Sequence, residues 1–174
     1  GGQPSVAGNA MTINTPSRTL GLNWDRFDIG SDASVTFNQP DSTSRVLNRI
    51  WSADPSVIMG RLNANGEVYL INQNGILFGN GAQVNVGGLV ASALNLSEGM
   101  LNKLLNSGLP TARGDRLEFA WDGTAAAFNT GFITVDAGAR IGTPAGGRIV
   151  LLAPKTADNL GLIQGGSGAE AIIA

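Results

Sequence analysis

Three aspartates, Asp25, Asp28 and Asp32, form the only tight group of carboxylates in the sequence. Grouped carboxylates can supply a general acid and base for glycoside hydrolysis, or ligands for Ca²⁺. The sequence has no histidine and no cysteine, which excludes Ser-His-Asp, Cys-His and His-zinc sites within this chain. Phe27 and Ile29 interleave with the aspartates, so a solvated loop explains them equally well. We expect no catalysis, no cofactor and no metal, with a β-helix polysaccharide lyase or hydrolase as the less favoured alternative.

A second pattern, Asn72-Gln73-Asn74-Gly75-Ile76, carries amide chemistry. Asn and Gly tolerate positive φ, and side-chain amides can bond to nearby backbone groups, so these residues suit a tight corner. Two interpretations stay open: a structural corner, which we favour, and direct contact with a partner. Asn48 and Arg49 are weaker candidates for such contact, and Arg49 is more simply explained as a solvated charge.

The centre of the chain contains four short apolar runs separated by Asn- and Gly-rich segments. They are Val68-Tyr69-Leu70-Ile71, Ile76-Leu77-Phe78, Val84-Asn85-Val86 and Leu89-Val90-Ala91. The connections are too short for helical crossovers, which need about a dozen residues. Antiparallel hairpins would fit this spacing. So would a solenoid, in which each coil has three short strands joined by tight corners.

A repeat in the second half of the chain favours the solenoid. Asn129-Thr130-Gly131-Phe132-Ile133 recurs as Asn159-Leu160-Gly161-Leu162-Ile163. Glycines and an apolar strand follow each copy. The same order of turn and strand, met twice, predicts that the two copies lie at equivalent corners of stacked coils.

The remaining pattern predicts one all-β domain with additions outside the stack. Residues 1–40 contain short alternating strands and are expected to form an N-terminal cap, and residues 41–96 the first coils. Residues 97–125 should leave the stack as a short helix, capped by Ser97 and followed by Gly108, and then a hairpin. Residues 126–174 should form further coils. Because the last strand, Ala171-Ile172-Ile173-Ala174, is apolar, we expect the native chain to continue beyond it.

Composition narrows the classes of partner. The net charge is −2 and the 11 Lys and Arg residues are scattered, so we expect no binding to nucleic acid. Trp24, Phe27, Phe37 and Trp51 could form an aromatic platform for a sugar, although filling the cap and the core is the favoured interpretation. A carbohydrate-binding adhesin module is therefore the second alternative.

Three segments together resemble the two-partner secretion domain of filamentous-haemagglutinin-like exoproteins. They are Ser44–Ile50, Asn63–Gly79, which includes Asn72-Gln73-Asn74-Gly75-Ile76, and Val86–Ser92. The family motif has Pro where this chain has Gln73. A second motif, N-P-N-L, is absent, and Asn38-Gln39-Pro40 lies near its place. The pattern is most similar to the branch of high-molecular-weight adhesins and haem-related exoproteins.

The resemblance implies a right-handed parallel β-helix with a cap and extra-helical elements. It also implies export through the Sec machinery, recognition in the periplasm by an outer-membrane transporter with POTRA domains, and release or display at the surface of a Gram-negative bacterium. The full exoprotein would then meet a host or glycan target. Because a folded β-helix is too wide for a transporter pore, we expect recognition of an extended or partly folded chain, a segment of which can add a strand to an exposed sheet edge of the transporter.

Overall fold

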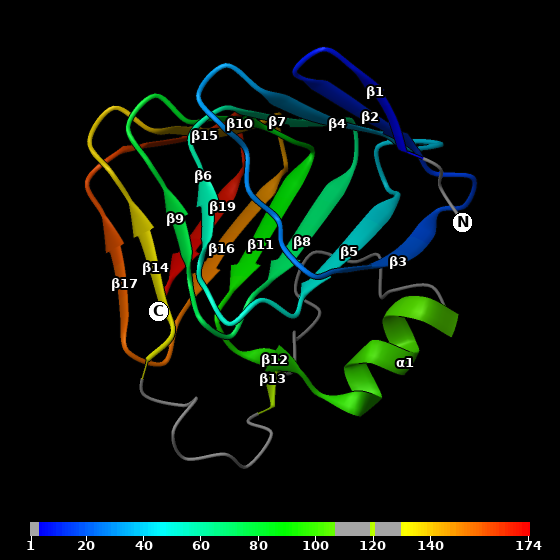
Figure 1. The fold of residues 1–174 in the computed structure, drawn as a ribbon. Helices are drawn as coiled ribbons and strands as arrows, with labels where there is room; N and C mark the ends of the chain where they lie inside the picture. Colours follow the sequence, from blue (N-terminus) through cyan, green and yellow to red (C-terminus); the bar gives the residue numbers. More distant parts are fainter. Residues whose placement is uncertain (1–3, 107–118, 121–129) are drawn as a thin grey trace.

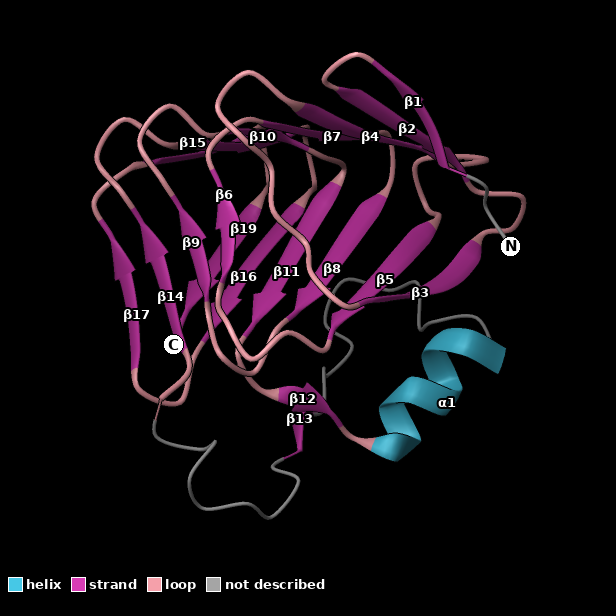
Figure 2. Ribbon diagram, in the orientation of Figure 1, coloured by secondary structure: helices cyan, strands magenta, loops and turns pink. Residues whose placement is uncertain are grey.

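The computed structural model describes residues 4–106, 119–120 and 130–174. Three sheets, parallel except for the N-terminal strand of one of them, wrap around one apolar interior and form a solenoid (Figures 1 and 2). The seven-stranded sheet contains, in spatial order, β1 (Pro4–Ala7), β2 (Ala10–Asn14), β4 (Ser34–Asn38), β7 (Arg61–Ala64), β10 (Gln83–Asn85), β15 (Arg140–Thr143) and β18 (Leu162–Gly165).

The other two sheets complete the coils. The six-stranded sheet runs through β19 (Glu170–Ile173), β16 (Arg148–Leu152), β11 (Gly88–Ser92), β8 (Glu67–Ile71), β5 (Arg45–Ile50) and β3 (Thr19–Trp24). The four-stranded sheet runs through β17 (Thr156–Asn159), β14 (Phe132–Val135), β9 (Ile76–Phe78) and β6 (Ser56–Ile58). The central apolar runs therefore lie in successive sheets of the coils, and the hairpin alternative is wrong for them.

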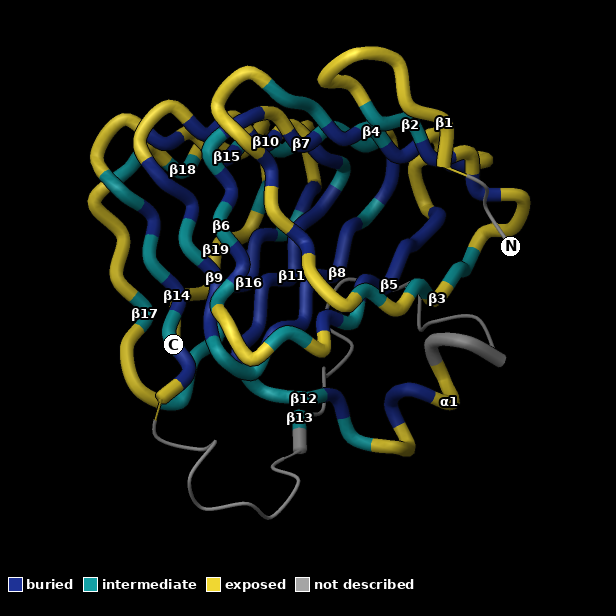
Figure 3. Tube along the Cα trace, in the orientation of Figure 1, coloured by how far each residue is buried: buried dark blue, intermediate teal, exposed yellow. Residues whose placement is uncertain are grey.

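The interior is filled by side chains that stack in rows along the solenoid axis. Val35, Leu62, Val84 and Ile141 hold equivalent positions in neighbouring strands of the seven-stranded sheet, and all four are buried. Since side chains of a strand alternate between its two faces, their neighbours in sequence point outward. Figure 3 shows that buried residues concentrate in the central strands and exposed residues in the loops. Burial of these rows is the main apolar contribution to stability.

The N-terminal region expected to form a cap is built mostly from strands of the stack itself. Residues 1–40 contribute β2, β3 and β4, which pair in parallel with β4, β5 and β7 respectively. Only β1 differs, because it pairs antiparallel with β2. The antiparallel strand β1 thus ends the seven-stranded sheet at its N-terminal side (Figure 1).

The prediction from the N-x-G-x-I repeat is wrong. Ile133 lies in the four-stranded sheet, where it pairs with Ala157, whereas Ile163 lies in the seven-stranded sheet, where it pairs with Ile141. The true coil is shorter than the 30-residue repeat: Ile141 to Ile163 is 22 positions and Ile133 to Ala157 is 24. A 30-residue step therefore moves the chain past one full coil and into the next sheet.

The extra-helical segment begins at the C-terminal end of β11. The helix α1 (Glu98–Asn106) starts where predicted, because the Ser97 hydroxyl accepts a hydrogen bond from the Met100 amide at 3.1 Å. The short β12 (Asn95–Leu96) pairs antiparallel with β13 (Phe119–Ala120). The rest of the predicted hairpin and Gly108 lie outside the described residues. The insertion explains why paired Val84 and Ile141 are so far apart in sequence.

The helix covers a second apolar cluster on the outer face of the six-stranded sheet. Its members are Leu47, Tyr69, Ile71, Val90, Leu96, Met100, Leu101 and Val150. Burial raises the pKa of the Tyr69 hydroxyl, and the negative charge of Glu67 raises it further. The hydroxyl therefore stays protonated and donates to Glu67 Oε2 at 3.3 Å. Arg45 Nε donates to the same oxygen at 2.9 Å, which gives the cluster a charged border.

Truncation of an inner row should destabilise the solenoid. Leu62→Ala removes a side chain that is 0% exposed and leaves a cavity between coils, so we expect a loss of about 2–5 kcal/mol in the free energy of unfolding. Arg61→Ala, at the neighbouring exposed position of β7, is the matched control and should change it by less than about 0.5 kcal/mol. Urea unfolding followed by circular dichroism measures both. Equal small effects would contradict the assignment of this row to the core.

Candidate functional site

The segment Asn72–Ile76 forms the corner between β8 and β9. Asn72 is 0% exposed, and its side-chain amide donates to the Asp54 carbonyl at 3.2 Å and to the Ser56 hydroxyl at 3.0 Å. Its Oδ1 accepts from the Asn74 backbone amide at 3.0 Å. The Asn72 side chain thus closes its own corner and ties it to the preceding coil, because Asp54 and Ser56 belong to that coil.

Asn74 and Gly75 complete the turn. The Asn74 side-chain amide donates to the Ser52 carbonyl at 2.8 Å, a second bond to the preceding coil. The Gly75 amide donates to the Asn72 carbonyl at 3.0 Å. Gly75 has a φ of 119°, and a Cβ there would lie 2.9 Å from both the ring and the carbonyl oxygen of Phe132. Only glycine fits this position without displacing the following coil.

The other two motif residues face opposite ways. Ile76 is 0% exposed and belongs to the inner core. Gln73, which takes the place of the family's Pro, is partly exposed, and its carbonyl oxygen lies close to Gly131 of the following coil. The motif therefore joins three coils through its backbone, its amides and one buried apolar side chain.

Asn48 is buried inside the solenoid. It is 0% exposed, its amide donates to the Tyr69 carbonyl at 3.2 Å, and its Oδ1 accepts from Trp24 Nε1 at 2.9 Å. Trp24 in turn packs edge-to-face on Phe27, with ring centroids 5.2 Å apart. Direct contact of Asn48 with a partner would require this end of the solenoid to open.

Arg49 is not simply a solvated charge. Its guanidinium carbon lies 4.6 Å from the centroid of the Trp51 ring, in a cation–π contact. Trp51 is 58% exposed, unlike Phe27 and Phe37, which are buried as expected for core aromatics. The four aromatic residues considered as a sugar platform therefore do not share one surface.

A corner that sequence reasoning missed joins Gln39 to Asn65. The Gln39 backbone amide donates to Asn65 Oδ1 at 2.8 Å, and Asn65 Nδ2 donates to the Gln39 backbone carbonyl at 2.8 Å. The Gln39 side chain accepts from the Gly66 amide at 3.0 Å and donates to the Glu67 carbonyl. The signal was present, because Asn38-Gln39-Pro40 lies near the place of the absent N-P-N-L motif. It builds a corner of the same kind with different residues.

The aspartates of the N-terminal region do not converge on a site. Asp25, Asp28 and Asp32 are exposed. Asp28 pairs with Arg26 and accepts from the Val57 amide at 2.8 Å. Within residues 4–106, 119–120 and 130–174, no three acidic side chains come close enough together to hold a metal ion. Asp28 thus has a structural contact that does not require catalysis to explain it.

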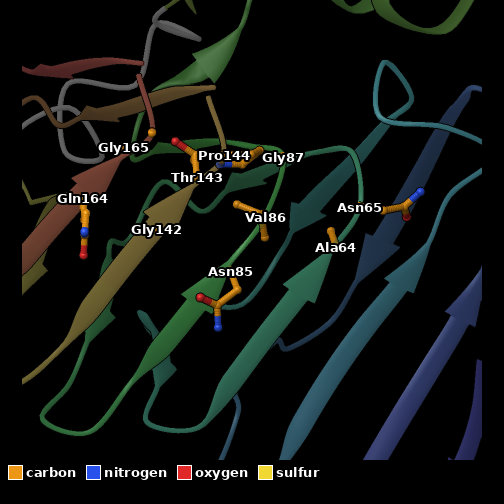
Figure 4. Close-up of a pocket in the computed structure, with 11 residues that line it drawn as sticks. Ala64, Asn65, Asn85, Val86, Gly87, Gly142, Thr143, Pro144, Gln164 and Gly165 are labelled. Carbon is orange, nitrogen blue, oxygen red and sulfur yellow. The ribbon is translucent and has the colours of Figure 1, made fainter. Parts of the chain in front are cut away.

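A shallow groove of about 520 Å³ lies away from the motif, at the corner that leads from the seven-stranded to the six-stranded sheet (Figure 4). No charged residue lines it; Asn65, Asn85, Thr143 and Gln164 supply its polar side chains. It therefore offers neither an acid–base pair nor a cluster of metal ligands. In the part of the chain that the structure describes, no helix has the length and apolar character to cross a membrane.

Comparison with known proteins decides the family. A model of the TPS secretion domain matches residues 2–170. The chain belongs to the TPS secretion domain family. The crystal structure of the HMW1 secretion domain from Haemophilus influenzae is similar to this chain, with a TM-score of 0.64 and 25% sequence identity. The superposition covers 95% of this chain and 55% of the HMW1 chain. The predicted fold, a right-handed parallel β-helix with extra-helical elements, is confirmed.

Two curated relatives agree with this assignment. Heme/hemopexin-binding proteins of Haemophilus influenzae are 45% identical over 92 residues in strain Rd and 42% identical over 86 residues in the second sequence. These matches cover 53% and 49% of the TPS secretion domain described here, but only 10% and 9% of the relatives. The predicted resemblance to exoprotein secretion domains is confirmed, and the enzyme and free-standing adhesin alternatives gain no support.

Loss of the Asn72 amide should destabilise the TPS secretion domain. Asn72→Ala leaves the buried Ser56 hydroxyl, the Asp54 carbonyl and the Asn74 amide without their partner, so we expect a loss of about 1–3 kcal/mol in the free energy of unfolding. Asn63→Ala is the matched control, because Asn63 is partly exposed and its side-chain amide has no hydrogen bond within the described residues. Chemical denaturation compares the two. A smaller effect for Asn72 than for Asn63 would contradict the structural role of the corner.

Alanine at Gly75 should be worse than alanine at another glycine with positive φ. Gly75→Ala adds both a backbone penalty and a clash with Phe132. At Gly146, φ is 73° and an added Cβ meets nothing within 4 Å, so Gly146→Ala isolates the backbone penalty of about 1–2 kcal/mol. Thermal unfolding should show the larger decrease in Tm for Gly75→Ala. Equal decreases would mean that the neighbouring coil accommodates the added methyl group.

Proposed function

We propose that this TPS secretion domain directs a larger exoprotein to a cognate outer-membrane transporter, whose periplasmic POTRA domains recognise it after export through the Sec machinery. The match of the family model to residues 2–170 carries the proposal. The exoprotein is then released from, or displayed on, the surface of a Gram-negative bacterium. Passage through the transporter requires an extended chain, and recognition precedes that passage.

The domain performs no catalysis in this proposal. The absence of histidine and cysteine from the sequence removes the commonest nucleophile–base pairs. The exposed aspartates and the uncharged groove described above support the same conclusion. Activity toward a host molecule or glycan belongs to the rest of the exoprotein, since the chain spans about a tenth of the length of the curated relatives it matches.

A second task of the domain is to serve as a template for further coils. At the last coil, Leu160 is 72% exposed, and Leu162, Ile172 and Ile173 are 42–44% exposed. In a solenoid, each coil buries its apolar side chains against its neighbours, and folding can propagate from a formed coil to the next. An added coil would cover these side chains and would extend the three parallel sheets.

The motif Asn72–Ile76 supports recognition by fixing the shape of its corner. Asn72 and Ile76 are both 0% exposed in the folded domain, so their side chains offer little surface to a partner. Of the five residues, Gln73 and Asn74 retain partial exposure. Loss of the motif would therefore impair recognition chiefly through the geometry of the loops that its amides hold.

Secretion should depend on both the transporter and the corner. The domain is expressed with and without its cognate transporter in a bacterial host, and culture medium and periplasm are assayed by immunoblot. Wild type should reach the medium only with the transporter. Asn72→Ala/Asn74→Ala should remain in the periplasm, with the amount in the medium reduced about tenfold or more, because the loss of both amides removes the hydrogen bonds that hold the corner.

The control for this experiment is Asn63→Ala/Asn85→Ala, which removes two amides from the outer face of the seven-stranded sheet. It should be secreted like wild type. Export of wild type without the transporter would overturn the proposed function. Normal export of the double corner variant would leave the function intact and remove the motif from it.

A further inference from the structure

Trp51 is held at the surface in a fixed orientation. Its indole nitrogen donates to Asn23 Oδ1 at 3.2 Å, and the Arg49 guanidinium lies over its ring at 4.6 Å. Its backbone amide donates to the Trp24 carbonyl at 2.8 Å. Despite these contacts, 58% of the residue is exposed. The ring is thus positioned by polar contacts while more than half of the residue stays exposed.

The position of Trp51 sets it apart from other exposed apolar residues. Among the described residues, it is the only aromatic one of the large exposed hydrophobic side chains; the others are Val6 in the N-terminal hairpin and Leu160, Leu162, Ile172 and Ile173 at the last coil. A further coil would cover the C-terminal group. Trp51 lies on the side of the solenoid, directly after β5, where stacking of coils would not cover it.

The motif amides hold the loop that carries Trp51. Asn74 donates to the carbonyl of Ser52, the next residue along the chain, and Asn72 donates to the carbonyl of Asp54. Gln73 lines the same small depression as Arg49 and Trp51. The buried corner and the exposed Arg49–Trp51 pair are therefore parts of one unit, with the amides on the inside and the two large side chains on the outside.

We propose that Arg49 and Trp51 are the principal contact by which the transporter docks this domain, an inference that rests on the proposed function. Trp and Arg are the residues most enriched among side chains that dominate binding energy at protein interfaces. Both are already ordered by their mutual contact, which lowers the entropy lost on binding. Asn74 acts as a positioning residue for them through Ser52.

The chemistry of the pair specifies the partner surface. Within the part of the chain that the structure describes, the Arg49 side chain makes no ion pair and no hydrogen bond, so its N–H groups can meet a carboxylate. The exposed face and edge of the Trp51 indole require an apolar neighbour. The transporter surface that fits the pair therefore places an Asp or Glu beside an apolar side chain, outside the pore and before translocation.

Binding of this 174-residue domain to its full-length cognate transporter in detergent micelles tests the inference, by biolayer interferometry at several salt concentrations. Trp51→Ala and Arg49→Ala should each weaken the affinity by about tenfold or more. Arg61→Ala, an exposed arginine on another sheet, should bind like wild type. Wild-type affinity should fall with added salt, and less steeply for Arg49→Ala, because a charged contact is screened. Circular dichroism melting verifies that each variant is folded.

A double-mutant cycle separates positioning from general destabilisation. If Asn74 acts through the pair, Asn74→Ala should weaken binding severalfold in the wild-type background and have little further effect in the Trp51→Ala background. Equal effects in both backgrounds would overturn the positioning role. If wild type binds the transporter but Trp51→Ala and Arg49→Ala bind equally well, the docking inference fails while the proposed function stands. If the folded wild type does not bind at all, the docking inference fails, and the proposed function fails with it only if the secretion assay also shows no dependence on the transporter.

Discussion

At every corner of a stacked coil, some backbone N–H and C=O groups have no hydrogen-bond partner in the sheets. This solenoid depends on other groups that supply those hydrogen bonds. Within strands, each amide and carbonyl bonds to the neighbouring coil; at a corner, the direction of the chain changes and that match is lost. Asn72 supplies these hydrogen bonds at the corner between β8 and β9. Gln39 and Asn65 supply them at the corner between β7 and β8. In both cases a side-chain amide, which donates and accepts at once, replaces the missing backbone partner.

The same constraint explains why polar residues are buried in a chain that is otherwise apolar inside. Asn48, Asn72, Ser56 and Ser92 are each at most 2% exposed. Asn72, Ser56 and Ser92 lie at or beside the end of a strand, whereas Asn48 lies within β5. Asn48 also bonds to Trp24 and so ties β5 to the first coil. Buried amides of this kind cost free energy unless they are fully paired. Their pairing across coils therefore fixes the register of the stack as well as its stability.

Sequence patterns predicted the features that depend on local chemistry. Short apolar runs between Asn- and Gly-rich segments located the central strands β8 to β11, and Ser97 located the start of the helix, because such runs and helix capping are properties of a few adjacent residues. The length of a coil was not local. Asn129–Ile133 and Asn159–Ile163 are alike in sequence, yet Ile133 and Ile163 lie in different sheets, since corner residues of similar type occur at all three corners. Asn65 could not be predicted as the partner of Gln39, because the two residues follow different strands of the stack.

In this fold, corner geometry constrains the residues of the motif, whereas the exposed residues beside it are available for contact with a partner. The segment most typical of the family, Asn72–Ile76, has its most distinctive side chains buried, since corner geometry permits few alternatives there. In the docking proposed above, the transporter contacts the residues that those buried groups hold in place. Near the motif, these are Trp51, Arg49 and the partly exposed Gln73. A change at Gln73 from the family's Pro is tolerated because the neighbouring amides, and not a fixed φ, hold the corner. The motif thus specifies the shape of its corner, and the exposed side chains beside it are held on that shape.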